Sequence, residues 1–153
     1  MNVHNALAEL PEWPTRSIAV LSTVDEGPHA IPVSAPVRAN GRCILLGLHR
    51  ERDSLARLRR RPEVALLLLA EGDIAFTARG RARVVEAPMA AAPDYVAVAI
   101  DVAQVDDHRQ AAFVVDSGAG RQWVDPAEQR ALGARVQALR QMPIGHPSAQ
   151  AAA

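Results

Sequence analysis

The sequence predicts a mostly β chain, an antiparallel barrel of six or seven strands with a few helices, the last of them C-terminal. Short runs rich in Val, Ile, Leu and Ala recur along the chain at strand length. Turn sequences such as "DEGP", "ANGR" and "EGD" join these runs, and tight hairpins imply antiparallel pairing. That many antiparallel strands in about 100 residues close most easily as a small barrel.

The first two predicted strands cover residues 16–24 and 29–37. The first, "RSIAVLSTV", is apolar and rich in β-branched residues. The second contains Pro32 and Pro36. Proline cannot donate to a strand ladder, so one edge of this strand must be unpaired or face a ligand.

A third strand and a short helix follow. The Asn-Gly pair of "ANGR" predicts a hairpin into a strand over residues 43–49. Leu55 and Leu58 are three residues apart, which suits a helix over roughly residues 51–61. Pro62 ends this helix.

The remaining strands are expected over four segments. Residues 63–70 are a continuous apolar run that predicts a strand buried on both faces. Residues 74–85 alternate between apolar and polar positions, as a strand with one buried face does. Residues 95–105 predict another long strand, and residues 111–115 begin a seventh, with "RQWV" as its continuation after the "SGAG" turn.

The terminal helix has a clear start signal at residues 125–128. Asp125 suits the N-cap, a proline follows at the first helical position, and an acidic residue comes third. Pro143 closes the helix. One helical face is apolar and consists of Leu132, Val136 and Leu139.

Length and charge bound the organisation of the chain. The 153 residues fit one domain, expected over residues 16–142, with an N-terminal segment at 1–15 and a disordered tail at 143–153. The formal net charge is zero, which argues against nucleic acid or a membrane surface as partner. No apolar run reaches the roughly 18 residues of a membrane span, and the start lacks signal-peptide features. We therefore expect a cytoplasmic protein.

Familiar catalytic motifs are not found. The sequence contains no GxSxG, GxGxxG, P-loop or HExxH pattern. Its five histidines lack metal-ligand spacing, so no metal site is predicted. The single cysteine, Cys43, lies in an apolar run and is expected to be a buried core residue.

The arginine-rich stretch around the first helix is the strongest candidate for chemistry. Arg50, Ser54, Arg57 and Arg61 recur at spacings that place them along one helical stripe. A hydroxyl, free backbone amides at a helix start and guanidinium groups suit a phosphate. A solvated helix face remains the alternative.

Three segments together resemble the pyridoxamine 5′-phosphate oxidase-like family of flavin-binding split barrels. They are "LSTVDEGPHAIPVS", "ILLGLHRERDSLARLRRRPEVALLLL" and "FTARGRARVVE", in this order, within residues 17–86. The later "VVDSGAGRQW" is similar to a strand of actinobacterial members, a group that includes deazaflavin binders. The resemblance implies an FMN-binding split barrel of six strands that forms a homodimer with two interfacial cofactor sites.

The resemblance also implies FMN or the deazaflavin coenzyme F-420 as cofactor, while some relatives bind haem instead. Carried over by position, the ring would lie along Ile31, Pro32, Val33 and Ser34. The ribityl chain would lie beside Gly47, Leu48 and His49. Around the phosphate, Arg52, Ser54 and Arg57 fall at the family's Ser, Lys and Asn positions, with Arg50 nearby, and Thr77 opens the strand that closes the site.

One departure bears on function. The chain has no lysine, so Ser54 stands where the family has its phosphate-binding lysine, and an arginine must supply that charge. The leading hypothesis is a flavin- or deazaflavin-dependent oxidoreductase acting on a small molecule. Within that hypothesis, His49 or the segment Arg121-Gln122-Trp123 could line the substrate pocket. The expected roles are nevertheless a plain strand-end histidine for His49 and core packing against the final helix for Trp123. The alternative is a non-catalytic flavin- or haem-binding carrier or sensor, and a nucleic-acid binder ranks below both.

Overall fold

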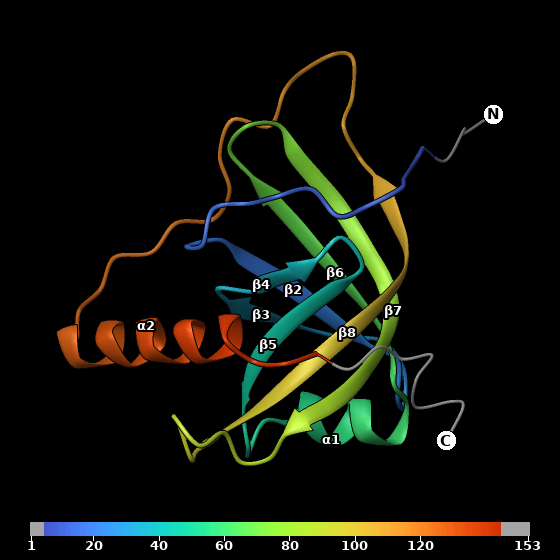
Figure 1. The fold of residues 1–153 in the computed structure, drawn as a ribbon. Coiled ribbons are helices and arrows are strands. Elements are labelled where there is room, and N and C mark those ends of the chain that lie inside the picture. Colours follow the sequence, from blue (N-terminus) through green and yellow to red (C-terminus); the bar gives the residue numbers. More distant parts are fainter. Residues whose placement is uncertain (1–4, 145–153) are drawn as a thin grey trace.

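The computed structural model describes residues 5–144, which form an antiparallel split barrel with two helices (Figure 1). The helices are α1 (Asp53–Arg60) and α2 (Pro126–Arg140). The strands are β1 (Ala6–Leu7), β2 (Ile18–Thr23), β3 (His29–Ser34), β4 (Val37–Asn40), β5 (Cys43–His49), β6 (Glu63–Ala70), β7 (Ile74–Glu86) and β8 (Tyr95–Asp107). The predicted fold class is confirmed. Of the predicted tail, residues 145–153 lie outside the described residues.

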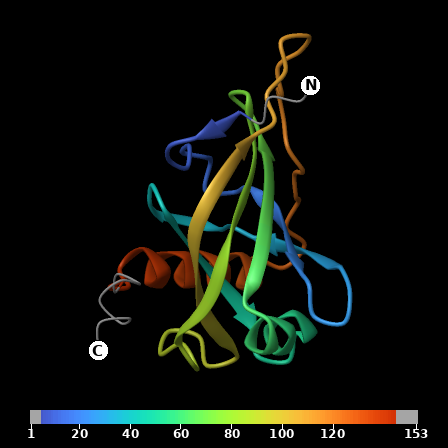
Figure 2. The ribbon, with the colours of Figure 1, turned by 90° about the vertical axis from the view of Figure 1, so that its right-hand side faces the viewer.

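The sheet runs in the order β3-β2-β6-β7-β8-β5-β4, and every pairing is antiparallel. Figure 2 shows β6, β7 and β8 side by side as one wall of the barrel. β1 pairs with the C-terminal end of β8. Strands β3 and β4 stand at the two ends of the path, so the barrel stays split between them.

Two apolar cores lie on the two faces of β5 and β8. Alternate residues such as Leu46 and Val98 belong to the barrel interior. Their neighbours Leu45 and Ala97 belong to a second core, which includes Val136 of α2. Since α2 covers the outside of β5 (Figure 1), these two strands are buried on both faces.

The predicted start of α2 is confirmed. The Asp125 side chain accepts a hydrogen bond from the backbone N–H of Ala127 at 2.9 Å, and Pro126 occupies the first turn. This satisfies one of the backbone donors that a helix N-terminus leaves free. Val136 and Leu139 are buried, so the apolar face expected from the sequence is the one that docks.

The prediction that residues 63–70 are buried on both faces is wrong. β6 alternates, with Leu67 and Leu69 exposed by 37% and 44%. Leu67 pairs with Val20 of β2, which in turn pairs with Pro32 of β3, and both of these side chains are exposed as well. We call Val20, Pro32, Leu67 and Leu69 the outer apolar face. An all-apolar run cannot reveal that one of its faces lacks a covering layer.

The predicted strand over residues 29–37 is broken in two. β3 ends at Ser34, and Ala35 adopts a positive φ of 50° before Pro36. That backbone turns the chain, and β4 begins at Val37. The Asn-Gly hairpin between β4 and β5 follows as predicted.

The seventh strand predicted over residues 111–115 does not form, nor does its continuation over "RQWV". Residues 108–125 instead make a long crossing segment from β8 to α2 (Figure 1), with one isolated bridge between Gln110 and Phe113. Val115 instead exchanges hydrogen bonds with Asp73, at the turn between β6 and β7, so this segment lies against a turn and not along a strand. Trp123 in this segment is 39% exposed and not packed into the core as expected.

Candidate functional site

A small cavity of about 110 Å³ lies at the seam of the barrel, between β3 and β5 and beneath α2. We call it the split cavity. It brings together most of the residues that the sequence suggested for a cofactor. Those that line it are Ile31, Pro32, Val33, Ser34, Gly47, Leu48, His49 and Arg52.

The position of β3 explains why a ligand has access here. Among the described strands, β3 pairs with β2 alone and stands at the end of the sheet. Its second edge is therefore unpaired, as the prolines in this segment predicted. Val33 is buried while Pro32 and Ser34 are exposed, so the strand presents its sides alternately to the core and to the surface.

The helix α2 supplies a wall that the sequence did not suggest. Leu132, Val136 and Leu139 line the cavity together with Arg135. The apolar stripe was visible in the sequence, but it indicated only packing. Arg135 lies three residues after Leu132 and four before Leu139, on the border of that stripe, and this position is the one signal that could have identified it.

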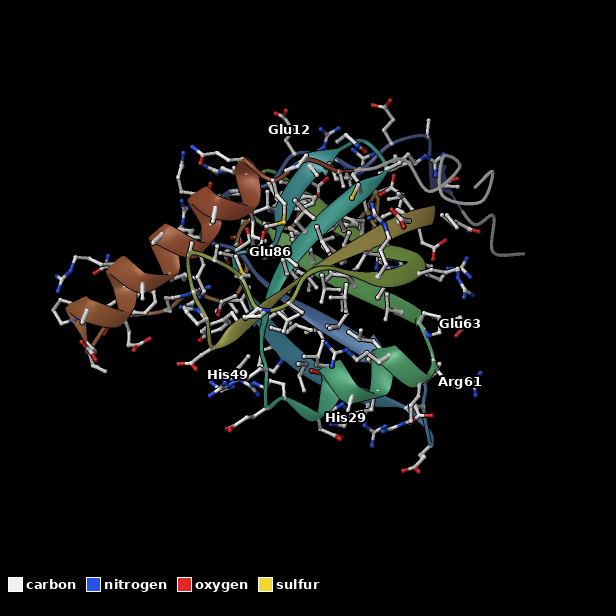
Figure 3. All side chains as sticks on the ribbon, turned by 60° about the horizontal axis from the view of Figure 1, so that its bottom comes forward. Glu12, His29, His49, Arg61, Glu63 and Glu86 are labelled. Atoms are coloured by element: carbon white, nitrogen blue, oxygen red, sulfur yellow. The ribbon has the colours of Figure 1, made fainter. Side chains whose placement is uncertain are left out.

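An aromatic pair connects α2 to β5 across the cavity. The Arg135 guanidinium carbon lies 3.9 Å from the centroid of the Tyr95 ring, within the range of a cation–π interaction. The Tyr95 and His49 rings meet edge to face with centroids 5.3 Å apart. His49 lies at the end of β5, just before α1 (Figure 3). These contacts hold the Tyr95 ring between His49 and Arg135.

The hydrogen bond at His49 indicates its tautomer. The backbone N–H of Glu51 donates to Nδ1 of His49 at 3.2 Å. In the neutral imidazole the proton therefore resides on Nε2. This leaves Nε2–H as the donor that the ring can offer to a ligand.

The charge of the split cavity is unbalanced. Arg52 and Arg135 both line it, and among residues 5–144 no carboxylate lies within 4.0 Å of either guanidinium. Arg50, by contrast, contacts Asp94 at 3.3 Å. Two uncompensated guanidinium groups at one small cavity favour an anionic ligand.

Two other predicted site residues lie elsewhere. Arg50 is in the turn before α1, where its side chain is mostly exposed and directed to Asp94. Thr77 lies near the start of β7, where its hydroxyl is 2.7 Å from Nε2 of His108. Thr77 pairs with Asp106 at the C-terminal end of β8, whereas the split cavity lies beside Tyr95 at the N-terminal end of that strand. Thr77 therefore does not line the split cavity within one chain.

Arg57 is also engaged away from the cavity. Its Nε donates to Asp53 at 2.7 Å, and its Nη1 donates to the backbone carbonyl of Asp25. Arg60 donates to the Asp25 carboxylate at 2.6 Å. The hydrogen bond from Arg57 is the main cause that lowers the pKa of Asp53. This group of residues ties α1 to the turn after β2.

The start of α1 holds polar groups without partners. Arg52 occupies the N-cap and makes no capping hydrogen bond through its side chain. Ser54 is only 1% exposed, yet its hydroxyl has no hydrogen-bond partner among the described residues. The same is true of the Thr23 hydroxyl and of Nδ1 of His29, which lie opposite each other on β2 and β3, with His29 beside α1 (Figure 3). Buried polar atoms of this kind favour a ligand or water as partner.

Among residues 5–144, no group of three or more His, Cys, Asp or Glu side chains could hold a metal ion. None of the described helices has the length and apolar character needed to cross a membrane.

Comparison with known sequences identifies the family. The sequence model described as pyridoxamine 5′-phosphate oxidase matches residues 6–142. The comparison with curated proteins gave no match.

Several solved structures share the fold at low sequence identity. A protein from Listeria innocua provisionally named pyridoxamine 5′-phosphate oxidase is 18% identical with a TM-score of 0.52, over 61% of this chain and 89% of that one. General stress protein 26 from Bacillus anthracis is 18% identical with a TM-score of 0.50, over 59% and 82%. An F-420 reductase is 15% identical with a TM-score of 0.54, over 65% and 100%. With the family match across most of its length, the chain belongs to the pyridoxamine 5′-phosphate oxidase family.

Proposed function

We propose that this protein is a flavin- or deazaflavin-dependent oxidoreductase that acts as a cytoplasmic homodimer on a small organic substrate. When bound, FMN or coenzyme F-420 supplies hydride exchange through its ring system. The observation that carries the proposal is the split cavity, where Arg52 and Arg135 lack carboxylate partners beside the strand expected to hold the ring.

The residues present suit the phosphate end of such a cofactor. Arg52 lines the cavity at the start of α1, where the helix dipole favours an anion. The Ser54 hydroxyl in the same turn is buried without a partner. A guanidinium fork matches a phosphate better than an ammonium group does, so Arg52 with Arg135 can replace the absent lysine.

The ring end needs more room than one chain provides. The split cavity, at about 110 Å³, is well below the roughly 300–1,000 Å³ of typical small-molecule sites. The outer apolar face begins at Pro32 on β3 and continues over Val20 and Leu67. A second copy of the chain on this face would bury these side chains and enclose the ring. The homodimer therefore forms part of the proposal.

The family membership supports a flavin-type cofactor, and the fold shared with an F-420 reductase supports keeping the deazaflavin beside FMN. In the proposed site, β3 would orient the ring. His49 would offer Nε2–H toward the ribityl chain or the substrate. Tyr95 and the apolar residues of α2 would exclude water.

The test is a titration of the purified protein with FMN and, separately, with F-420, followed by ring fluorescence. We expect saturable binding of one of them, weakened at least about tenfold by Arg52→Gln or by Arg135→Gln, since each removes a charged hydrogen bond. The matched control is Arg59→Gln, at an exposed position on α1, which should bind as the wild type does. Equal binding by all four proteins would contradict the phosphate assignment, and a monomer in sedimentation would contradict the interfacial site.

A non-catalytic carrier is the second candidate, and Ser54 at the family's lysine position favours it. A weaker hold on the flavin phosphate is compatible with a protein that transports or senses its ligand. His49 would then be the residue to hold a haem, after its ring proton has moved from Nε2 to Nδ1 and the hydrogen bond from the Glu51 N–H has been lost. Absence of flavin binding together with a sharp Soret band on haem addition, lost in His49→Ala, would select this candidate.

A further inference from the structure

A second, larger cavity lies along a neighbouring face of α2, and Leu132 and Val136 border both cavities. Its volume is about 790 Å³, within the range typical of small-molecule sites. The crossing segment closes one side, the N-terminal stretch before β2 and the end of β6 close another, and one face of α2 forms the long wall. We call it the α2 cavity.

The walls of the α2 cavity combine apolar surface with free space. The α2 residues that line it run from Gln129 to Arg140 on one helical face, about 16 Å at the rise of an α-helix. Leu69 of β6 and Trp123 of the crossing segment are both partly exposed toward solvent there. At Gly133 on the same helix face, an added Cβ would meet nothing within 4 Å. The cavity can therefore hold a flat apolar body.

The charges of the cavity favour an anion. Among the residues that the structure describes, three arginines and one carboxylate, that of Glu71, line the cavity. Glu71 pairs with Arg16. Arg140 donates to the hydroxyl of Thr15 at 2.6 Å, and Arg121 to the backbone carbonyl of Arg16 at 3.2 Å. Two guanidinium groups thus have only neutral partners among the described residues.

Arg121 is the better placed of the two to hold a ligand. Its guanidinium carbon lies 5.7 Å from the centroid of the Trp123 ring, which sets a cation beside an aromatic surface. Partial burial lowers the pKa of Arg121, as expected for a cation that has lost water without gaining a carboxylate. An aromatic acid would meet both needs, with its ring on Trp123 and its carboxylate on Arg121.

We propose that the α2 cavity binds a small aromatic carboxylic acid, held by Arg121 and Arg140 with its ring against Trp123 and the apolar face of α2. The cavity shares Ala35, Leu132 and Val136 with the split cavity, so the acid would lie next to the proposed cofactor. In the proposed oxidoreductase this acid would be the substrate, and that role rests on the proposed function, whereas the binding of the acid does not.

The test is calorimetric titration with 2-naphthoate and with its neutral counterpart, 2-naphthalenemethanol. We expect naphthoate to bind at least about tenfold more tightly than the alcohol, and Arg121→Gln to remove this preference while leaving alcohol binding unchanged. Gly133→Leu fills the cavity and should abolish binding of both probes. Arg130→Gln, an exposed α2 position outside the cavity lining, is the matched control and should bind as the wild type does.

The same proteins are then titrated with FMN and F-420, which separates the two proposals. Naphthoate binding without cofactor binding would support the acid site and overturn the proposed oxidoreductase. Cofactor binding without any naphthoate preference over the alcohol would overturn the acid site alone. Gly133→Leu tests whether the two sites are distinct, and we expect it to retain its cofactor. Naphthoate binding that survives both Arg121→Gln and Gly133→Leu would place the acid elsewhere and also overturn the proposal.

Discussion

The arginines of the barrel surface and those of the split cavity differ in what they contact. On β7, Arg79 and Arg83 each lie 2.8 Å from a carboxylate oxygen of β8, and Arg81 lies 3.2 Å from Glu63. In the split cavity, Arg52 and Arg135 have no such partner among the described residues.

This difference shows where positive charge is available to a ligand. The chain carries 17 basic and 17 acidic residues, so overall charge says nothing about anion binding. Most arginines of the described barrel are neutralised locally by neighbouring strands or turns. Four of the described arginines without a carboxylate line the two cavities, where an anion from solution can pair with them: Arg52, Arg121, Arg135 and Arg140.

The largest effect is expected from removing both cations of the split cavity. Arg52→Gln combined with Arg135→Gln should weaken FMN or F-420 binding by about 100-fold or more, since two charged hydrogen bonds are lost. Thermal unfolding should change little, because neither guanidinium has a carboxylate partner among the described residues, and the contact of Arg135 with Tyr95 contributes only about 0.5–1 kcal/mol. The control, Arg59→Gln with Arg61→Gln, removes the same charge from exposed positions of the same region. Equal losses of affinity in both double variants would mean that cofactor affinity depends on the total positive charge of the region and not on Arg52 and Arg135 in particular.

A neutralised pair should behave in the opposite way. Asp25 is 8% exposed and accepts from Arg60 at 2.6 Å. Asp25→Asn should lower the free energy of unfolding in urea by about 1–2 kcal/mol, because a charged hydrogen bond is lost at a nearly buried carboxylate. Cofactor affinity should stay unchanged. Unchanged stability would show that α1 is held by its apolar residues alone.

The pair of Arg83 and Asp101 should influence a buried thiol. Cys43 lies opposite Asp101 in the β5–β8 register. Burial first, and Asp101 second, raise the pKa of Cys43 to about 11 from 9.0, while Arg83 opposes this.

Between pH 9 and 11 the native state thus keeps a proton that the unfolded chain releases, and stability falls as pH rises, by at most about 1.4 kcal/mol per pH unit. Urea unfolding of the wild type and of Cys43→Ala over this range should differ in slope, the variant losing less stability. Parallel slopes would refute the raised pKa.

The smallest effect is expected at the most exposed pair. Arg81 and Glu63 have side chains exposed by 67% and 52%, and Figure 3 shows Glu63 at the surface. Arg81→Gln should change the free energy of unfolding by less than about 0.5 kcal/mol, as solvent screens such pairs. A loss of stability as large as that of Asp25→Asn would mean that the exposure of an ion pair does not determine its contribution to the free energy of unfolding.

Local signals in the sequence sufficed for much of the fold. Asn40-Gly41 predicted its hairpin, and Asp125-Pro126 predicted the start of α2, because turns and caps depend on a few adjacent residues. The outward exposure of Leu67 could not be predicted, since it depends on which face α2 covers. The strand expected over residues 111–115 does not form, because pairing depends on which segment lies alongside, and Val115 lies against Asp73 in the turn between β6 and β7.

As with the fold, part of the candidate site could be predicted from the sequence. Motif order pointed to Pro32 and His49, and both line the split cavity. The cation Arg135 was missed because it reaches the cavity only through the docking of α2, some 86 residues later in the chain than His49. Arg57 shows the converse. Helical spacing suggested that Arg57 contacts a ligand. In the structure its guanidinium group donates to the backbone carbonyl of Asp25 in the nearby turn instead.

The wall shared by the two cavities has a consequence for how this protein can diverge. Leu132, Val136 and Ala35 border both spaces, so a larger or smaller residue at any of them alters two volumes at once. A lineage that changes one cavity to accept a new ligand must therefore also compensate in the other cavity, or that second cavity no longer fits its own ligand. Among homologues, these three positions should vary together, and independent drift at each would indicate that only one compartment is in use.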